Sequence, residues 1–328
     1  MNDNNLKTIL TVLTINILSW YEFMIYITLS PIIATIFFPT LALQKSLFYT
    51  LLIASITFIA RIGGGLFFGK IADSNSKRKS LVHSVILMSI ATICIALLPT
   101  YQTIGYASLL MLVIVRLIQA FCIGGEFGSS MALLMQIAPT KRIGLYGSIP
   151  MVGMGIGILL ASVTSIILSY IPTESVYNWG WRIPFLVAGF FGVISLYLKK
   201  GSKKNIAKRT KSAFSFKRYK KEILSGIGLF SCSIFHLYLF CILIKAVMLS
   251  NAIQFSHFLY TTIVIVFIIF AFVGGMLSGS RYCKQIFITN IILLPIYTVL
   301  VFVFHCTNCL ILSSLSVGIL QGIIPKML

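Results

Sequence analysis

The chain has 328 residues, of which 58% are hydrophobic and only 10% are charged, and its mean hydropathy is +1.01. A soluble domain carries about 25% charged residues, and a transmembrane barrel shows short alternating segments, so the composition excludes both classes. Apolar runs long enough to cross about 30 Å of hydrocarbon recur along the sequence, and they predict an all-α polytopic membrane protein.

Ten candidate membrane spans follow one another along the chain. The first contains Glu22, lacks a small-residue cleavage site and is too long for a signal peptide, so we expect it to be retained as a helix. The predicted spans are 9–36, 47–69, 80–98, 105–134, 144–171, 180–198, 223–249, 258–278, 285–304 and 306–325.

The net charge of +20 is distributed unevenly between the loops. Alternating the spans places 21 of the 26 basic residues on one side, including eleven in 199–221. This asymmetry follows the positive-inside rule and predicts that both termini are cytoplasmic. Because the charge is explained by topology, a nucleic-acid partner is not expected, although the basic loop can touch anionic lipid.

The stretch 199–221 has no apolar period, and it divides the predicted spans into six and four. We therefore expect an N-terminal six-helix bundle at 1–198, a basic cytoplasmic linker at 199–221 and an incomplete C-terminal bundle of about four helices at 222–328. A weak repeat supports two related halves, because GKIADSNSKRK follows the second span and GMLSGSRYCK follows the eighth.

Glycine-rich stretches lie within the spans rather than before a soluble helix. GGLFFGK resembles a phosphate-binding loop, but Ile71 replaces the required Ser or Thr and no strand precedes it. Gly153, Gly157 and Ala161 recur every four residues and predict a small face for close helix packing.

Neither a metal site nor a cofactor is expected from the sequence. Cys306 and Cys309 form a single CxxC beside His305, whereas a structural zinc site needs about four ligands. We interpret these cysteines as ordinary helix residues.

Ionisable residues inside a membrane span are costly, and they are functional candidates by default. In the fourth span Gln119, Cys122, Glu126 and Ser130 are spaced by three or four, which places them on one helix face. The neighbouring glycines leave room for a helix, water or ligand near Glu126. Its carboxylate is either a proton carrier or part of a structural ion pair or hydrogen bond.

Glu22 in the first span is flanked by Trp20 and Tyr21, whose rings are able to pack around a cationic ligand. The alternative is that both rings contact lipid or neighbouring helices. Arg116 lies ten residues before Glu126, about 15 Å along a helix, so it is expected to face Glu22 or a substrate carboxylate instead.

Asp73 lies after the second span and is followed by Lys77 and Arg78. A carboxylate and two cations at this spacing predict a salt-bridge latch between helices. Such pairs are weak singly, but they matter when two conformations differ by only a few kcal/mol. Arg61, inside the second span, is interpreted as structural.

Four motifs in order carry a resemblance to a known family. They are NILSWYEF at 16–23, ARIGGGLFFGKIADSNSKRK at 60–79, RLIQAFCIGGEFGSS at 116–130 and WGWRIPFLVAG at 179–189. They resemble the metabolite:H⁺ symporters of the major facilitator superfamily, which include carriers for proline/glycine betaine, citrate, α-ketoglutarate and shikimate.

The resemblance implies proton-coupled uptake of a small zwitterion or organic acid across a bacterial inner membrane by alternating access, with proline or glycine betaine as the leading solute. It implies that Glu126 and Glu22 face a central cavity, that Arg116 and Glu126 couple protons or bind solute, and that Asp73 is the gating latch.

The sequence departs from the family pattern in several places. Glu22 replaces an Asp, Ser19 replaces an acid, and Gly279 stands where the second latch would have an Asp. Ten predicted helices stand where the family has twelve, so the chain resembles a C-terminally truncated carrier. The alternative function is therefore a transport-inactive remnant. An enzyme is not expected, because none of the four histidines pairs with an acid at helical spacing.

Overall fold

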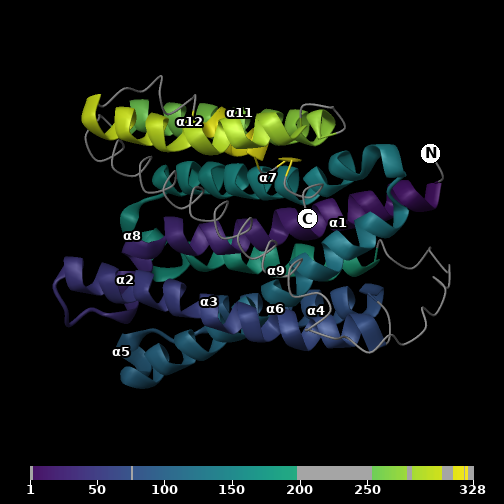
Figure 1. Cartoon of the computed structure of the whole chain (residues 1–328). Helices are drawn as coiled ribbons and strands as arrows, with labels where there is room; N and C mark the ends of the chain where they lie inside the picture. Colours follow the sequence, from purple (N-terminus) through teal and green to yellow (C-terminus); the bar gives the residue numbers. More distant parts are fainter. Residues whose placement is uncertain are drawn as a thin grey trace. The chain divides into compact units, whose positions relative to one another are not determined.

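The computed structural model describes residues 3–74, 77–197, 253–278, 283–304, 313–320 and 322–323, and all regular elements in these ranges are helical (Figure 1). The helices are α1 (Asp3–Thr28), α2 (Ser30–Phe37), α3 (Leu43–Ser74), α4 (Lys77–Leu97), α5 (Tyr101–Ile104), α6 (Tyr106–Ile137), α7 (Ile143–Ser169), α8 (Thr173–Ser175), α9 (Arg182–Tyr197), α11 (Ile253–Leu277) and α12 (Cys283–Phe304). A π-helical turn, Val176–Gly180, precedes α9.

Within the described ranges, five helices are long and apolar enough to cross a membrane: Asn5–Thr28 in α1, and α3, α4, α6 and α7. The fold class predicted from hydropathy, an all-α polytopic bundle, is confirmed. The linker 199–221 and the predicted span 223–249 lie outside the described residues, as do Cys306, Cys309 and Gly279.

The first predicted span is two helices rather than one. The α1 helix ends at Thr28 and α2 begins at Ser30, with Pro31 in its first turn. Proline has no N–H to donate and its ring blocks the preceding turn, so it is tolerated at the start of a helix and breaks a continuous one. The residues of 9–36 are therefore helical with an interruption before Pro31.

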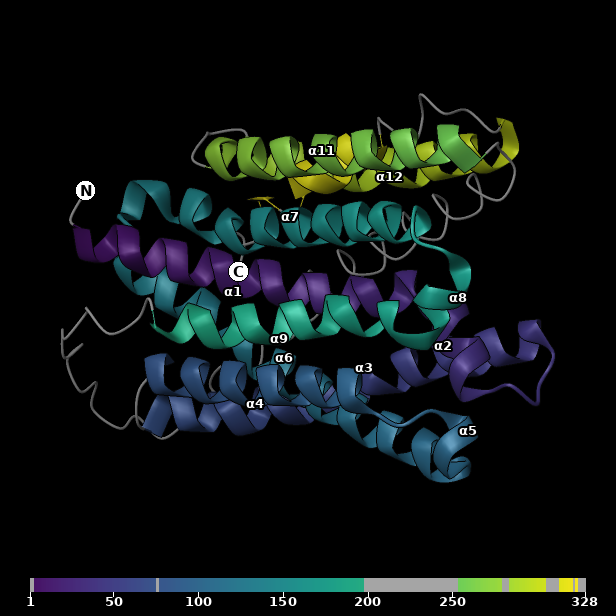
Figure 2. The same ribbon diagram turned by 180° about the vertical axis from the view of Figure 1, so that it is seen from behind.

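Packing divides the chain into two units, of which the first comprises residues 1–133 and 160–208 and the second 134–159 and 209–328. In the first unit α9 lies against α4 and α1, and α4 lies against α3, as both ribbon views show (Figures 1 and 2). The predicted boundaries 1–198, 199–221 and 222–328 stay a prediction.

The core of the first unit is aromatic and aliphatic. Trp181, the residue before α9, is fully buried, and its ring meets Phe37 edge-on at 5.9 Å and Phe185 at 6.4 Å. The buried side chains of this cluster are Tyr21, Ile25, Tyr26, Leu29, Ile33, Phe37, Ala54, Ile95, Ala96, Leu98, Leu112, Ala161, Leu168, Trp181, Phe185 and Ala188.

Glycines let α3 and α6 touch backbone to backbone. A Cβ added at Gly64 would overlap the backbone of Phe121, and one added at Gly124 would overlap the backbone of Arg61. Because only glycine permits this approach, GGLFFGK is a helix-packing sequence, as its position inside a predicted span indicates.

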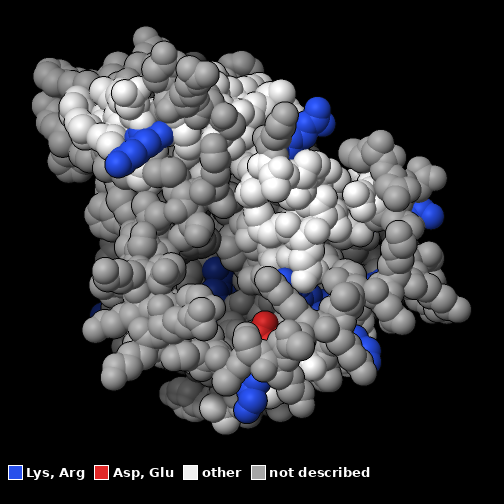
Figure 3. Space-filling view, turned by 45° about the vertical axis from the view of Figure 1, so that its right-hand side comes forward, with Lys and Arg blue, Asp and Glu red and all other residues white. Residues whose placement is uncertain are grey.

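The second unit uses the same device. A Cβ at Gly155 in α7 would overlap the Ile268 side chain of α11, and one at Gly144 would overlap Ser278. Of the predicted packing residues, Gly153 and Gly157 belong to this unit and Ala161 to the first, and all three are buried. The face of the molecule seen in Figure 3 is largely white where it is described, with Lys and Arg side chains scattered over it, as expected for a chain with few charges.

Candidate functional site

The polar face of α6 is buried inside the first unit. Gln119, Cys122, Glu126 and Ser130 are each at most 2% exposed, because their spacing of three or four residues turns all four to the same side of the helix. Glu126 is therefore held among packed helices rather than at the surface. Its neighbours Gly124 and Gly125 pack against α3, as the glycine pattern predicts.

Ser19 joins Glu126 to α1. The Ser19 hydroxyl contacts the Oε2 atom of Glu126 and also lies 3.0 Å from the Ile15 carbonyl oxygen and 3.7 Å from the Met88 sulfur. Ser19 is 3% exposed. A hydrogen bond to a carboxylate is stronger than one between neutral groups, so this contact is a main polar link between α1 and α6.

Glu22 lies one turn further along α1 and is 1% exposed. Among the described residues, neither of its carboxylate oxygens has a partner in hydrogen-bond geometry. The nearby Thr92 hydroxyl donates to the Met88 carbonyl at 2.9 Å and accepts from Gln119 at 2.8 Å. Glu126 and Arg116 both act on Glu22 electrostatically. Two acids and one arginine therefore share a buried region.

Arg116 is fixed by neighbours on two sides. Its Nη1 atom donates to Gln119 Oε1 at 2.9 Å, and its guanidinium carbon lies 3.8 Å from the centroid of the Tyr26 ring. Gln119 in turn donates to Thr92 of α4. The chain Arg116–Gln119–Thr92 therefore ties α6 to α4, and the planar guanidinium is stacked in the way that arginine, unlike lysine, allows.

The two aromatic residues before Glu22 have different surroundings. Tyr21 is buried and its hydroxyl lies 3.1 Å from Thr164 Oγ1, while the Trp20 ring packs edge-on against Phe23 at 5.8 Å. Both rings contact protein groups, and their predicted role around a cation stays a prediction. Arg61 lies over the Phe23 ring at 4.8 Å, which fits its interpretation as a structural residue.

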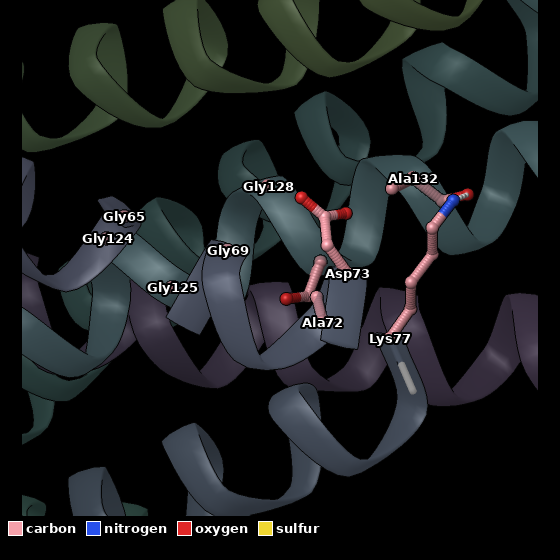
Figure 4. A pocket seen from close by; sticks show the side chains of 10 residues that line it. Gly65, Gly69, Ala72, Asp73, Lys77, Gly124, Gly125, Gly128 and Ala132 are labelled. Atoms are coloured by element: carbon pink, nitrogen blue, oxygen red, sulfur yellow. Dashed lines mark hydrogen bonds between the residues drawn. The ribbon is translucent and has the colours of Figure 1, made fainter. Parts of the chain in front are cut away.

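A separate cleft lies where α3 ends. It encloses about 230 Å³ and is lined by Gly65, Gly69, Ala72, Asp73, Lys77, Gly124, Gly125, Gly128, Ser129 and Ala132. Figure 4 shows the Asp73 and Lys77 side chains directed toward α6, where Lys77 Nζ donates to the Ala132 carbonyl at 3.4 Å. The structure thus places two of the predicted latch residues at one cleft. Arg78 follows in the first turn of α4.

Sequence reasoning did not single out Ser19, Tyr26 or Thr92 as site residues. The sequence contains only part of the information needed to find them. The spacing places Ser19, Glu22 and Tyr26 on one face of α1, but it does not indicate which residues of α4 or α6 they contact. The structure describes no group of three or more His, Cys, Asp or Glu side chains arranged to hold a metal ion.

Ionisable side chains buried among long apolar helices mark solute, ion or proton pathways in membrane proteins. Residues 7–200 match the family described as "Sugar (and other) transporter", and the chain belongs to this family. This is a family of transporters rather than enzymes, and its members move small solutes.

Relatives with curated names support the same classification. The proline/betaine transporter of Escherichia coli (strain K12) is 32% identical over 201 residues, covering 61% of this chain and 40% of that protein. The alpha-ketoglutarate permease of the same strain is 34% identical over 186 residues, covering 56% and 43%. The matched part of the chain spans about two fifths of the length of these relatives.

The fold agrees with solved carriers. The structure of the major facilitator superfamily proton:xylose symporter XylE aligns with a TM-score of 0.75 at 13% identity, covering 99% of this chain and 81% of that one. At this identity the likeness shows the fold alone. The resemblance to major facilitator carriers that the four motifs indicated is confirmed.

Proposed function

We propose that this chain is a proton-coupled carrier that imports a small zwitterion or organic acid across a bacterial inner membrane by alternating access. Proline or glycine betaine is the leading solute. The named relatives support this range, because one is a proline/betaine transporter and another an alpha-ketoglutarate permease.

One observation carries the proposal. Glu22 is buried and interacts electrostatically with both Glu126 and Arg116. Thr92 lies close to it, but the Thr92 hydroxyl donates to the Met88 carbonyl, and neither Glu22 carboxylate oxygen has a partner in hydrogen-bond geometry among the described residues. A buried charge without a hydrogen-bond donor is expensive, so the site gains from a cation or a proton at Glu22.

The residues divide into roles by charge. Glu22 takes the cationic end of a zwitterion, and Arg116 takes the carboxylate, because its fixed guanidinium suits a planar anion. Glu126 carries the coupling proton on the polar face of α6. Gln119 holds Arg116, and Tyr21 and Trp20 adjoin the acid that meets the cation. Asp73 and Lys77, with Arg78 beside them, form the gating latch.

The test is uptake into liposomes that contain the purified chain. Labelled proline and glycine betaine, and then a panel of small organic acids, are offered with and without an inward proton gradient. We expect gradient-driven uptake, its loss in Glu126→Gln, and a strong rise in KM for zwitterions in Glu22→Gln. Glu174→Gln is the matched control, because Glu174 is an exposed acid in α8.

The outcomes separate the two functions. Uptake that needs Glu126 but not Glu174 supports the coupled carrier. If uptake occurs but the proton gradient does not change its rate, the chain is a carrier without proton coupling. No uptake of any solute by folded protein contradicts transport by this chain and favours the transport-inactive alternative.

A further inference from the structure

Ser19 is placed to respond to the protonation state of Glu126. Its single hydroxyl proton has two oxygen acceptors within reach: the Glu126 carboxylate on α6, and the Ile15 carbonyl on its own helix at 3.0 Å. A hydroxyl donates one proton and accepts through its lone pairs, so Ser19 donates to only one of these two oxygens at a time.

We propose that Ser19 is a positioning residue for proton release from Glu126, an inference that rests on the proposed function. When Glu126 is protonated, its O–H donates to Ser19 Oγ and the Ser19 hydroxyl donates to the Ile15 carbonyl. When the proton leaves for water, the Ser19 hydroxyl rotates and donates to the new carboxylate. Ser19 keeps its own proton throughout, so the only proton that crosses is that of Glu126.

The surroundings make this donor important. The charged and titratable groups around the contact are Glu22 and Tyr26 on α1, and Arg116 and Cys122 on α6. From α4, Met88 and Thr92 face the cluster, and neither side chain titrates. Whenever Glu22 is ionised it adds a second negative charge beside Glu126, so the ionised form of Glu126 is favoured by hydrogen-bond donors from neighbouring helices.

The proposal separates two transport modes. Exchange of labelled for unlabelled solute cycles the loaded carrier and leaves Glu126 protonated. Net uptake requires the proton to leave, which creates the carboxylate that Ser19 stabilises. Losing the hydroxyl therefore slows net uptake selectively, by about 10- to 100-fold, the worth of one hydrogen bond to a charged group.

The experiment compares Ser19→Ala, Ser19→Thr and Ser84→Ala in liposomes, measuring gradient-driven uptake and exchange for each. Ser19→Thr keeps a hydroxyl on the same carbon. Ser84 is a matched control, because it is fully buried and its hydroxyl donates to the Leu81 carbonyl of its own helix. We expect Ser19→Ala to lose net uptake but keep exchange, Ser19→Thr to restore net uptake, and Ser84→Ala to retain both.

Equal loss of both modes in Ser19→Ala, or unchanged net uptake, would overturn the proposal. A second readout does not depend on transport: the infrared carbonyl band of protonated Glu126, identified by its absence in Glu126→Gln, is expected to shift in Ser19→Ala. An unshifted band shows that the bond does not form. If the band shifts in Ser19→Ala but the wild-type chain moves no solute, the Ser19–Glu126 bond is supported, whereas the proposed function and the coupling role are both rejected.

Discussion

Arg116 and Tyr26 form a buried cation–π contact between α6 and α1, with the guanidinium carbon 3.8 Å from the ring centroid. Arg116 is 3% exposed and Tyr26 is fully buried. Without water to compete, such a contact is worth about 2 kcal/mol or more. It holds the arginine in the region shared by the two acids.

The ring of Tyr26 matters more than its hydroxyl. Tyr26→Phe keeps the ring and loses one hydrogen bond, to the Thr50 carbonyl at 3.2 Å, so we expect a loss of stability of about 1 kcal/mol. Tyr26→Leu also loses the cation–π contact and is expected to cost about 2 kcal/mol more. Thermal unfolding of the purified variants in detergent measures both changes. Equal melting temperatures for the two variants would contradict this contact.

Gln119 holds Arg116 for solute binding in the proposed carrier. Gln119→Leu removes the bonds to Arg116 and to Thr92, so we expect KM for glycine betaine to rise about 10-fold, the lower end of the worth of a hydrogen bond to a charged group, while kcat changes little. Gln102→Leu, at an exposed glutamine in α5, is the control and is expected to leave KM unchanged. A fall in kcat at constant KM would place Gln119 in the conformational step instead.

The α3–α6 contact predicts opposite outcomes for glycines in the same helices. Gly64→Ala drives a methyl group into the Phe121 backbone and is expected to cost about 1–3 kcal/mol or more. Gly69→Ala and Gly128→Ala meet no atom within 4 Å, so each is expected to be neutral or to stabilise by up to about 1 kcal/mol through better helix propensity. Thermal unfolding and the monodisperse yield from detergent report the difference. Equal behaviour of all three variants would show that the two helices do not approach this closely.

Arg182 closes the end of a neighbouring helix. Its Nη1 atom donates to the Ala96 carbonyl at 3.1 Å, in the last turn of α4, where a cation is favoured. We expect Arg182→Met to lower the free energy of unfolding by about 1–2 kcal/mol. Arg142→Met, at an exposed arginine, serves as the comparison and is expected to change little. If Arg182→Met is as stable as Arg142→Met, the hydrogen bond from Arg182 to the Ala96 carbonyl does not stabilise the fold.

Hydropathy predicted the long helices of the first unit, because a helix in lipid must satisfy its own backbone hydrogen bonds and is therefore recognised from one continuous apolar run. The order and spacing of the four motifs predicted the family. The buried face of α6 also followed from local spacing, since residues three or four apart on a helix share a side. Pro31 was a visible signal for the break between α1 and α2, but the predicted span 9–36 treated this region as one helix. The chemistry of proline, which lacks a backbone N–H, explains the break.

The partners of the buried polar groups followed from tertiary structure alone. Ser19 and Glu126 are 107 residues apart, and Gln119 reaches Thr92 across 27. A helical pattern fixes which residues share a face, but it contains no information on how each helix is rotated against its neighbours. That rotation is set by packing, here by glycines that let α3 and α6 touch and by the aromatic core around Trp181. The sequence by itself determined that acids lie within the membrane spans, and the packing decided which groups they meet.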